Sequence, residues 1–109
     1  MARPGAPAVT DIFGVLSHPL RRGLIHQLAS GERNVAELAQ GQVVTRPAVS
    51  QHLRLMLDVG VVSERRSGRQ RWYRLAPSAF DDVRDFLAGL DAFWSHRLDA
   101  LADLMGEAE

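Results

Sequence analysis

Three side chains that can form base-specific hydrogen bonds lie close together in the stretch VTRPAVSQHLRLM, residues 44–56. The carboxamide of Gln51 can pair with adenine through two hydrogen bonds, and the guanidinium of Arg54 can pair with guanine or with a phosphate. The hydroxyl of Ser50 can donate to a base or to the nucleic-acid backbone. This combination of residue types predicts a surface that reads the edges of bases.

The same stretch has the periodicity of an amphipathic helix. At 100° per residue, the three polar side chains gather on one side and the apolar ones on the opposite side. Thr45 is a good N-cap, Pro47 falls in the first turn, and Gly60 supplies the left-handed residue that ends a helix. The apolar side is formed by Val49, Leu53, Met56 and Leu57. The stretch therefore predicts a helix over residues 45–58 with a buried back and a hydrogen-bonding front.

A shorter helix is expected just before residues 45–58, so that the two helices form a helix-turn-helix motif. Asn34 and Glu37 form a capping box ahead of an apolar run, so a short helix is expected to begin at Asn34. In such a motif the second helix lies in the major groove of DNA, and its N-terminal residues contact base edges. Thr45 and Arg46, at the start of that helix, are placed for contacts with phosphate, helped by the helix dipole. We therefore expect the helix over residues 45–58 to read DNA.

The chain continues with a basic β-hairpin. VVSERR and RQRWYRL are rich in β-forming residues and are separated by SGR, which is typical of a short turn. The hairpin carries five arginines, Arg65, Arg66, Arg69, Arg71 and Arg74. Alternation along the second strand places Trp72 and Arg74 on one face, and Arg71 with Tyr73 on the other. A charged hairpin can simply be solvated, but after a helix-turn-helix we expect Arg69 to enter a flanking minor groove or contact phosphate, and Arg71 to contact the backbone.

The order helix, helix, helix-turn-helix and hairpin is that of a winged helix-turn-helix domain. We expect a mainly α fold with a small β-hairpin, built from residues 10–77. Residues 1–9, rich in Pro, Ala and Gly, are predicted to form a flexible N-terminal arm. Residues 78–109 are predicted to form one long C-terminal helix, ending near Gly106, that serves dimerisation.

Apolar residues recur at heptad spacing through the predicted C-terminal helix. They are Phe80, Val83, Leu87, Leu90, Trp94, Leu101 and Leu104, interrupted by Arg97. Such a stripe can pack entirely within its own domain, but this one is longer and wider than a domain of this size needs. We therefore expect the stripe to be shared between the core of its own domain and a second subunit.

Charged residues are divided unevenly along the 109 residues. Residues 1–77 contain 11 Arg and 5 acidic residues, a net charge of +6. Residues 78–109 contain 2 Arg and 8 acidic residues, a net charge of −6. The division indicates that only one half meets a polyanion. Every basic residue is Arg, whose planar guanidinium suits bidentate contacts with phosphate and guanine.

Other features exclude several classes of protein. The chain has no Cys, which excludes disulfides, thiolate metal sites and thiol redox sensing. No apolar run reaches the roughly 18 residues of a membrane span, and the N-terminus lacks the apolar region of a signal peptide. We therefore expect a soluble, cytoplasmic protein that does not associate with a membrane.

The titratable residues offer neither a clear metal site nor a catalytic pair. The histidines are His18, His26, His52 and His96. No pair has zinc-site spacing with enough further donors, although His96 with Asp99 or Asp103 could bind zinc across a dimer. Ser50 and His52 are two residues apart on a helix, so they point about 160° apart and cannot act as nucleophile and base. We predict no cofactor, no metal and no enzymatic activity.

Two stretches resemble the ArsR/SmtB family of bacterial winged-helix repressors. They are HPLRRGLIHQLASGERNVAELA and TRPAVSQHLRLMLDVGVVSERRSGRQRWYRL, and the resemblance covers about residues 11–76. It implies a homodimeric repressor of double-stranded DNA, paired through its first and last helices, with two reading helices in successive major grooves. The operator would then be pseudo-palindromic, with half-sites about 34 Å apart. The residues expected at the dimer interface are Ile12, Phe13, Leu87, Leu90, Trp94 and Leu101.

The sequence departs from the metal-sensing members of that family. Those members carry a Cys-containing pair in the third helix, where this chain has NVAELAQ, or an Asp/His set along the last helix, where it has only His96. The C-terminal FWSHRLDAL resembles a subgroup without the metal motifs. Two alternatives stay open: a zinc- or nickel-responsive repressor on the same scaffold, and a winged-helix module used only for protein contacts. The effector, whether a small molecule or a metal, is not specified by the sequence.

Overall fold

Polar side chains at the helix N-termini determine where the helices of the core begin. The computed structural model describes residues 9–107, so the predicted arm over residues 1–9 lies almost entirely outside the described residues. The N-cap side chains of the first four helices each accept a hydrogen bond from a backbone N–H of the first turn. These caps satisfy donors that the first turn leaves unpaired. The capping residues are Asp11, His18, Asn34 and Thr45.

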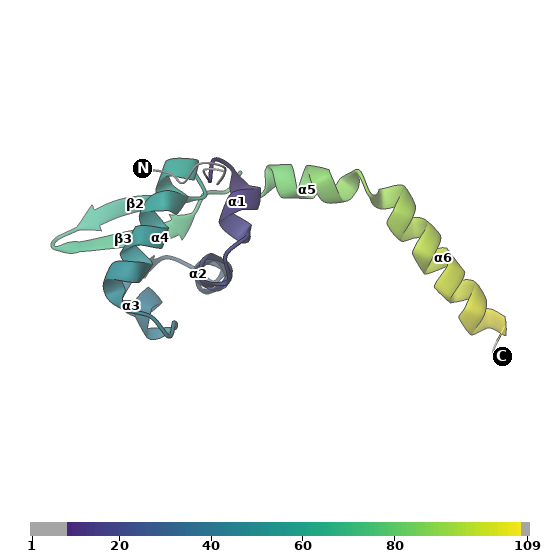
Figure 1. Cartoon of the computed structure of the whole chain (residues 1–109), viewed down its shortest axis with the longest axis horizontal. Coiled ribbons are helices and arrows are strands. Elements are labelled where there is room, and N and C mark those ends of the chain that lie inside the picture. The colour runs from purple at the N-terminus through teal and green to yellow at the C-terminus, as the bar shows by residue number, and fades with distance from the viewer. Residues whose placement is uncertain (1–8, 108–109) are drawn as a thin grey trace, which may run out of the picture.

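The predicted helices and hairpin follow one another in the predicted order, with one further strand and with the C-terminal helix divided in two. The elements are α1 (Ile12–Leu16), α2 (Pro19–Ala29), β1 (Arg33–Asn34), α3 (Val35–Gln40), α4 (Arg46–Val59), β2 (Val62–Ser67), β3 (Gln70–Leu75), α5 (Asp81–Ala88) and α6 (Asp91–Glu107). The first four helices and the sheet form one body, and α5 and α6 leave it as an extended arm (Figure 1). The arm makes the radius of gyration 18.6 Å, where a compact chain of this size would have about 13 Å. No helix among the described residues is long and apolar enough to cross a membrane.

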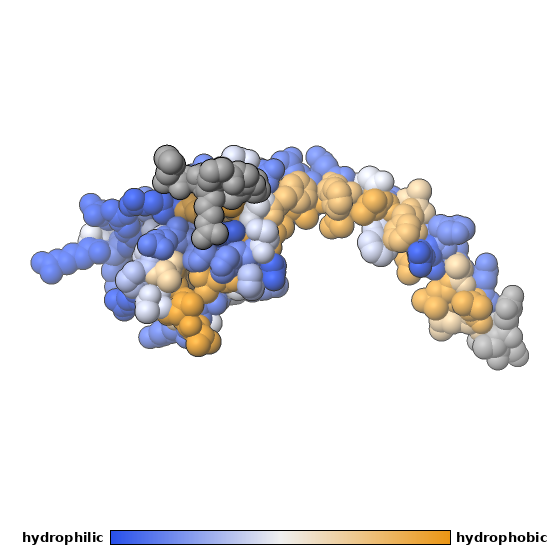
Figure 2. Space-filling view, in the orientation of Figure 1, coloured by the Kyte–Doolittle hydropathy of each residue, from blue (hydrophilic) through white to orange (hydrophobic). Residues whose placement is uncertain are grey.

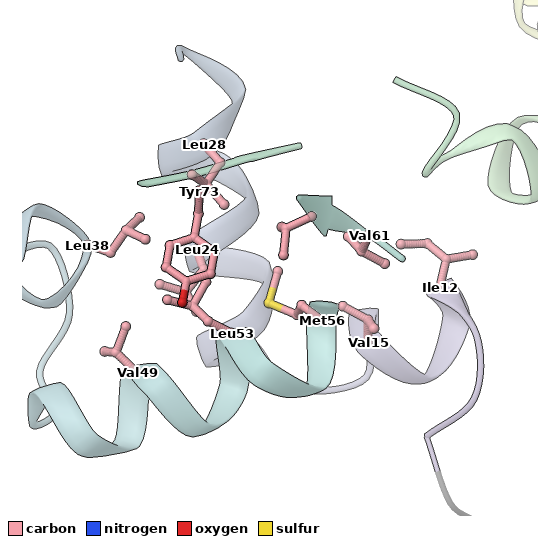
Figure 3. Close-up of a cluster of buried hydrophobic side chains, with 11 residues drawn as sticks. Ile12, Val15, Leu24, Leu28, Leu38, Val49, Leu53, Met56, Val61 and Tyr73 are labelled. Carbon is pink, nitrogen blue, oxygen red and sulfur yellow. The ribbon is translucent and has the colours of Figure 1, made fainter. Parts of the chain in front are cut away.

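One apolar core lies between the first four helices and the sheet (Figure 3). Its fully buried side chains are Leu24, Leu38, Leu53, Met56, Val15, Val49 and Val61. Helix α4 contributes Val49, Leu53 and Met56, as its periodicity predicts, whereas Leu57 is only partly buried. The core thus holds α4 by one side along most of its length.

The sheet has a third strand that the sequence pattern does not predict. The strand order is β1-β3-β2, and both pairings are antiparallel. Strand β1 is only two residues long and pairs with β3 opposite Trp72 and Tyr73. The expected hairpin is present, and Gly68 with a φ of 63° begins its two-residue turn. Tyr73 is buried against the core and Trp72 lies on the opposite face, so the predicted alternation is confirmed.

The prediction of one long C-terminal helix is wrong, because the helix is interrupted at residues 89–90 and continues as α6. The N–H of Gly89 still bonds to the carbonyl of Asp85, but the N–H of Leu90 bonds to Leu87, three residues back. This tighter turn ends α5, and glycine, with no side chain to pack, offers little resistance to it. Helix α6 then begins at Asp91 and changes direction (Figure 1).

Gly60 ends α4 with a φ of 92°, and its N–H bonds to the carbonyls of Met56 and Leu57. A Cβ at this position would meet no atom within 4 Å. Replacing Gly60 by Ala should therefore lower the free energy of unfolding by about 1–2 kcal/mol, through backbone strain alone. Urea denaturation at one fixed protein concentration measures the change.

The matched control is Gly106→Ala, because Gly106 also has open space around it but no positive φ. This change should leave the free energy of unfolding unaltered or raise it by up to about 1 kcal/mol. A Gly60→Ala protein as stable as the wild type would contradict the role given to the left-handed residue.

Candidate nucleic-acid interface

Burial of one side of α4 turns its polar side outward. Ser50, Gln51 and Arg54, the three residues predicted to read bases, are all exposed. Thr45 and Arg46, at the N-terminal end of α4, are exposed as well. The hydroxyl of Thr45 accepts a bond of 3.4 Å from the N–H of Ala48, so this oxygen already serves as the cap.

The exposed side of α4 faces the hairpin of β2 and β3, which we call the wing, across a groove. We call this the α4–wing groove; it is lined by Asn34, Val35, Ala36, Arg46, Pro47, Ser50, Gln51, Arg54, Leu57, Arg69, Gln70, Arg71 and Tyr73. Six of the seven residues predicted to contact DNA are in this set, and Thr45 is the exception. The fold therefore brings together the two parts of the chain that sequence reasoning selected separately. Residues 34–36, at the start of α3, also line the groove, and no sequence pattern predicted that they would.

The α4–wing groove is lined by arginine side chains on both walls. Arg46 and Arg54 come from α4, and Arg69 and Arg71 come from the wing. Glu64 lies beside the wing wall, with a carboxylate oxygen 3.9 Å from Nη1 of Arg71. Because both side chains of this pair are well exposed, the pair is weak. The groove thus presents an excess of positive charge.

The outer face of the wing is held to the body by an ion pair. Nε and Nη2 of Arg65 donate to the two carboxylate oxygens of Glu32 at 2.8 and 2.6 Å. The hydrogen bond from Arg65 holds the pKa of Glu32 below its ordinary value. The guanidinium of Arg65 also lies 5.7 Å from the ring centroid of Trp72. Arg65 therefore positions the wing. The sequence pattern alone did not distinguish this role of Arg65 from a role in DNA binding.

Tyr73 closes the base of the groove. Its side chain is buried, and burial raises the pKa of its phenol above the ordinary value, with the charge of Glu64 acting in the same direction. The phenol therefore stays protonated near neutral pH and keeps a hydrogen-bond donor next to α4.

The helix-turn-helix is held against α2 by close packing. Nε2 of Gln27 donates to the carbonyl of Leu38, which ties α2 to α3 at 3.4 Å. A Cβ on Gly23 would lie 2.8 Å from Nε2 of Gln42, so the turn before α4 approaches the backbone of α2. The absence of a side chain at Gly23 allows this approach.

The histidines are placed differently from one another. His18 caps α2, and its ring lies 4.6 Å from that of His52, between centroids. His52 is half-buried at the back of α4, whereas His26 and His96 are exposed. Within residues 9–107, no three His, Cys, Asp or Glu side chains are grouped so that they could hold a metal ion.

The residues expected at a dimer interface are mostly exposed in the single chain. Phe13, Leu87, Trp94 and Leu101 are between 43% and 53% exposed, and Leu90 is half-buried. Figure 2 shows hydrophobic side chains gathered along the lower side of α5 and continuing onto α6. Ile12 is only 4% exposed, so it serves the core of its own chain.

Comparison with known proteins gives consistent relationships. The family model described as "Bacterial regulatory protein, arsR family" matches residues 18–64. The HTH-type transcriptional regulator Rv2034 of Mycobacterium tuberculosis is 38% identical over 83% of this chain and 81% of its own. A biofilm growth-associated repressor of Xylella fastidiosa is 39% identical over 64% of this chain and 61% of its own.

A solved structure has the same winged helix-turn-helix fold. It is the homodimeric DNA-binding domain, from Mycobacterium bovis, of a possible ArsR-family transcriptional regulator. The alignment has a TM-score of 0.58 and 26% identity, and it covers 81% of this chain and 79% of that domain. The expectation of a mainly α, winged helix-turn-helix fold is therefore confirmed.

Proposed function

The chain belongs to the arsR family of bacterial regulatory proteins, and we propose that it is a homodimeric, sequence-specific, DNA-binding repressor of transcription. The α4–wing groove carries the proposal, because it combines base-reading side chains with arginines on both walls. Such a protein represses by occupying its operator and keeping polymerase away. We place it in the cytoplasm, where bacterial DNA lies.

Base reading is assigned to the front of α4. With α4 in the major groove, Gln51 pairs with adenine, Arg54 pairs with guanine or a phosphate, and Ser50 donates to a base or the backbone. Arg46 and the first turn of α4 contact phosphate, where the positive end of the helix dipole favours an anion. These four side chains line the same groove, which supports a single continuous contact with DNA.

The wing is assigned to the DNA backbone. Arg66 lies directly opposite Arg71 on the two strands, so two like charges share one face of the hairpin. Like charges in this position destabilise a hairpin, and a phosphate placed between them would relieve the repulsion. Arg69 lies in the two-residue turn at the tip of the wing. We assign Arg69 and Arg71 to phosphate or minor-groove contacts.

The arm is assigned to a second copy of the chain. Every residue of α6 up to residue 106 is exposed, and its large apolar side chains are between 48% and 65% exposed. In proteins most of the stability of a helix comes from tertiary packing, and the 17 residues of α6 have little of it within one chain. A second chain that covers α5 and α6 would bury this face, and it would set two α4 helices about 34 Å apart for a pseudo-palindromic operator.

Gln51→Ala should relax specificity at one base position of the operator, by about 1–3 kcal/mol. Arg69→Ala should instead weaken binding to all sequences about equally and reduce the slope of log affinity against log salt by about one. Fluorescence anisotropy of the chelator-treated dimer on an operator and its single-base variants, at two salt concentrations, separates the two effects.

The control is Arg84→Ala, which removes an exposed arginine of α5 outside the α4–wing groove. It should leave both the specificity and the salt slope unchanged. If Gln51→Ala left discrimination among operator variants untouched, the assigned front of α4 would be wrong. If the wild type had no salt-dependent affinity for DNA, the protein would be a module for protein contacts instead.

Trp94→Glu should convert the dimer to a monomer and reduce operator affinity at least tenfold, because a charge would be buried in the apolar face of the arm. Sedimentation velocity over a range of concentrations measures the change of state. His96→Glu introduces the same side chain two residues away, about 160° around α6, and should leave the dimer intact. Equal effects of the two substitutions would contradict the assignment of that face.

A further inference from the structure

Arg21 is a buried cation that is not among the residues lining the α4–wing groove. It is 6% exposed and occupies a position of the apolar stripe of α2, together with Leu24 and Leu28. None of the ion pairs among residues 9–107 involves its guanidinium. A buried charge without a carboxylate partner is stabilised by hydrogen bonds to neutral acceptors.

Each of the three guanidinium nitrogens has one acceptor, and these acceptors lie on two other elements. Nε of Arg21 donates to the carbonyl of Val15 at 2.9 Å, and Nη2 donates to the carbonyl of Gly14 at 3.1 Å. These carbonyls belong to the last turn of α1, where the negative end of the helix dipole favours a cation. Nη1 lies 3.1 Å from Nδ1 of His52, on α4. One side chain of α2 therefore joins the end of α1 to the DNA-reading helix.

The contact with His52 requires a neutral imidazole. A guanidinium can only donate, so Nδ1 of His52 must be the unprotonated nitrogen and accept. The ring is packed against His18, whose Nδ1 accepts from the N–H of Leu20 and is likewise unprotonated. Burial lowers the pKa of His52 from its ordinary value, and the charge of Arg21 acts in the same direction. The contact is thus complete above the ordinary pKa of histidine. It is lost as the pH falls through the lower pKa that His52 has in the folded chain.

We propose that Arg21 and His52 are a positioning pair for DNA recognition, which holds α4 in register while the His52 ring is neutral and releases it when the ring is protonated. The proposal rests on the DNA-binding function proposed above. His52 lies about 160° around α4 from both Ser50 and Arg54, and it is not among the residues that line the α4–wing groove. It therefore acts on the reading residues through the rotation of the helix.

The pair also connects α4 to the arm. Phe13 of α1 packs edge-on against Phe86 of α5, with ring centroids 5.7 Å apart. Because Arg21 holds the end of α1 and the back of α4 with the same guanidinium, the base of the arm and the reading helix share one polar anchor. The His52 contact is the part of this anchor that acid can break.

The test measures the affinity of the dimer of this 109-residue chain for two duplexes, from about pH 7.5 down to the lowest pH at which the helices remain folded. One duplex is an operator selected at neutral pH from a random library, and the other is its scramble. Acidification should lower the ratio of operator to scramble affinity about tenfold for the wild type. Protonation that merely added positive charge would strengthen binding to both duplexes and leave their ratio unchanged.

His52→Asn keeps an acceptor oxygen near the position of Nδ1 but cannot titrate, so it should hold the neutral-pH ratio at both ends of the range. His52→Leu removes the acceptor and should show the lowered ratio throughout. The matched control, His26→Asn, changes an exposed histidine of α2 and should keep the wild-type pH profile. Circular dichroism at each pH confirms that the helices remain folded.

Three results would overturn the pair. They are a wild-type ratio that does not fall with acidification, a fall that persists in His52→Asn, and a fall that is lost only in His18→Asn, which would assign the effect to the cap of α2. Absence of DNA binding by the wild type at every pH would overturn the DNA-binding function itself, and the positioning pair with it.

Discussion

The burial of Val49, Leu53 and Met56 is the constraint on which the rest of the molecule depends. All three side chains are fully buried, and burial of each stabilises the fold by about 1.5–3 kcal/mol. Because a helix repeats every 3.6 residues, burying this stripe also determines which residues of α4 face outward. The outward position of Ser50, Gln51 and Arg54 is therefore a consequence of apolar packing. Polar contacts at the edge of the stripe can change the rotation of α4 about its axis only slightly.

Local interactions made most of the core predictable. The caps at Asn34 and Thr45 and the left-handed Gly60 each act within a few residues, so their sequence signals specify helix ends directly. The apolar period of α4 gave its buried side, and strand alternation gave the faces of the wing. The α4–wing groove follows from these elements once the chain order indicates a winged helix-turn-helix. Six of the seven predicted DNA-contacting residues meet in it for that reason.

The features that could not be predicted depend on non-local contacts. Strand β1 is two residues long, and only its pairing with β3 makes it a strand. The C-terminal stripe continues in heptads across residues 89–90, so periodicity gave no sign of the break between α5 and α6. Arg21 occupies a stripe position three residues before Leu24, but its acceptors on α1 and α4 become neighbours only in the folded chain. A charged residue within an otherwise apolar stripe is the one signal that could have singled it out.

Hydroxyl-radical footprinting of the wild-type protein on a selected operator tests the central claim most directly, because it reports the contact and the dimer geometry together. Two α4 helices held by one dimer should protect two stretches of DNA backbone whose centres lie about 10 base pairs, or one helical turn, apart. The protection should weaken with added salt, as the arginines of the groove require. A single protected stretch, or protection without a defined spacing, would contradict a homodimer that reads DNA with α4.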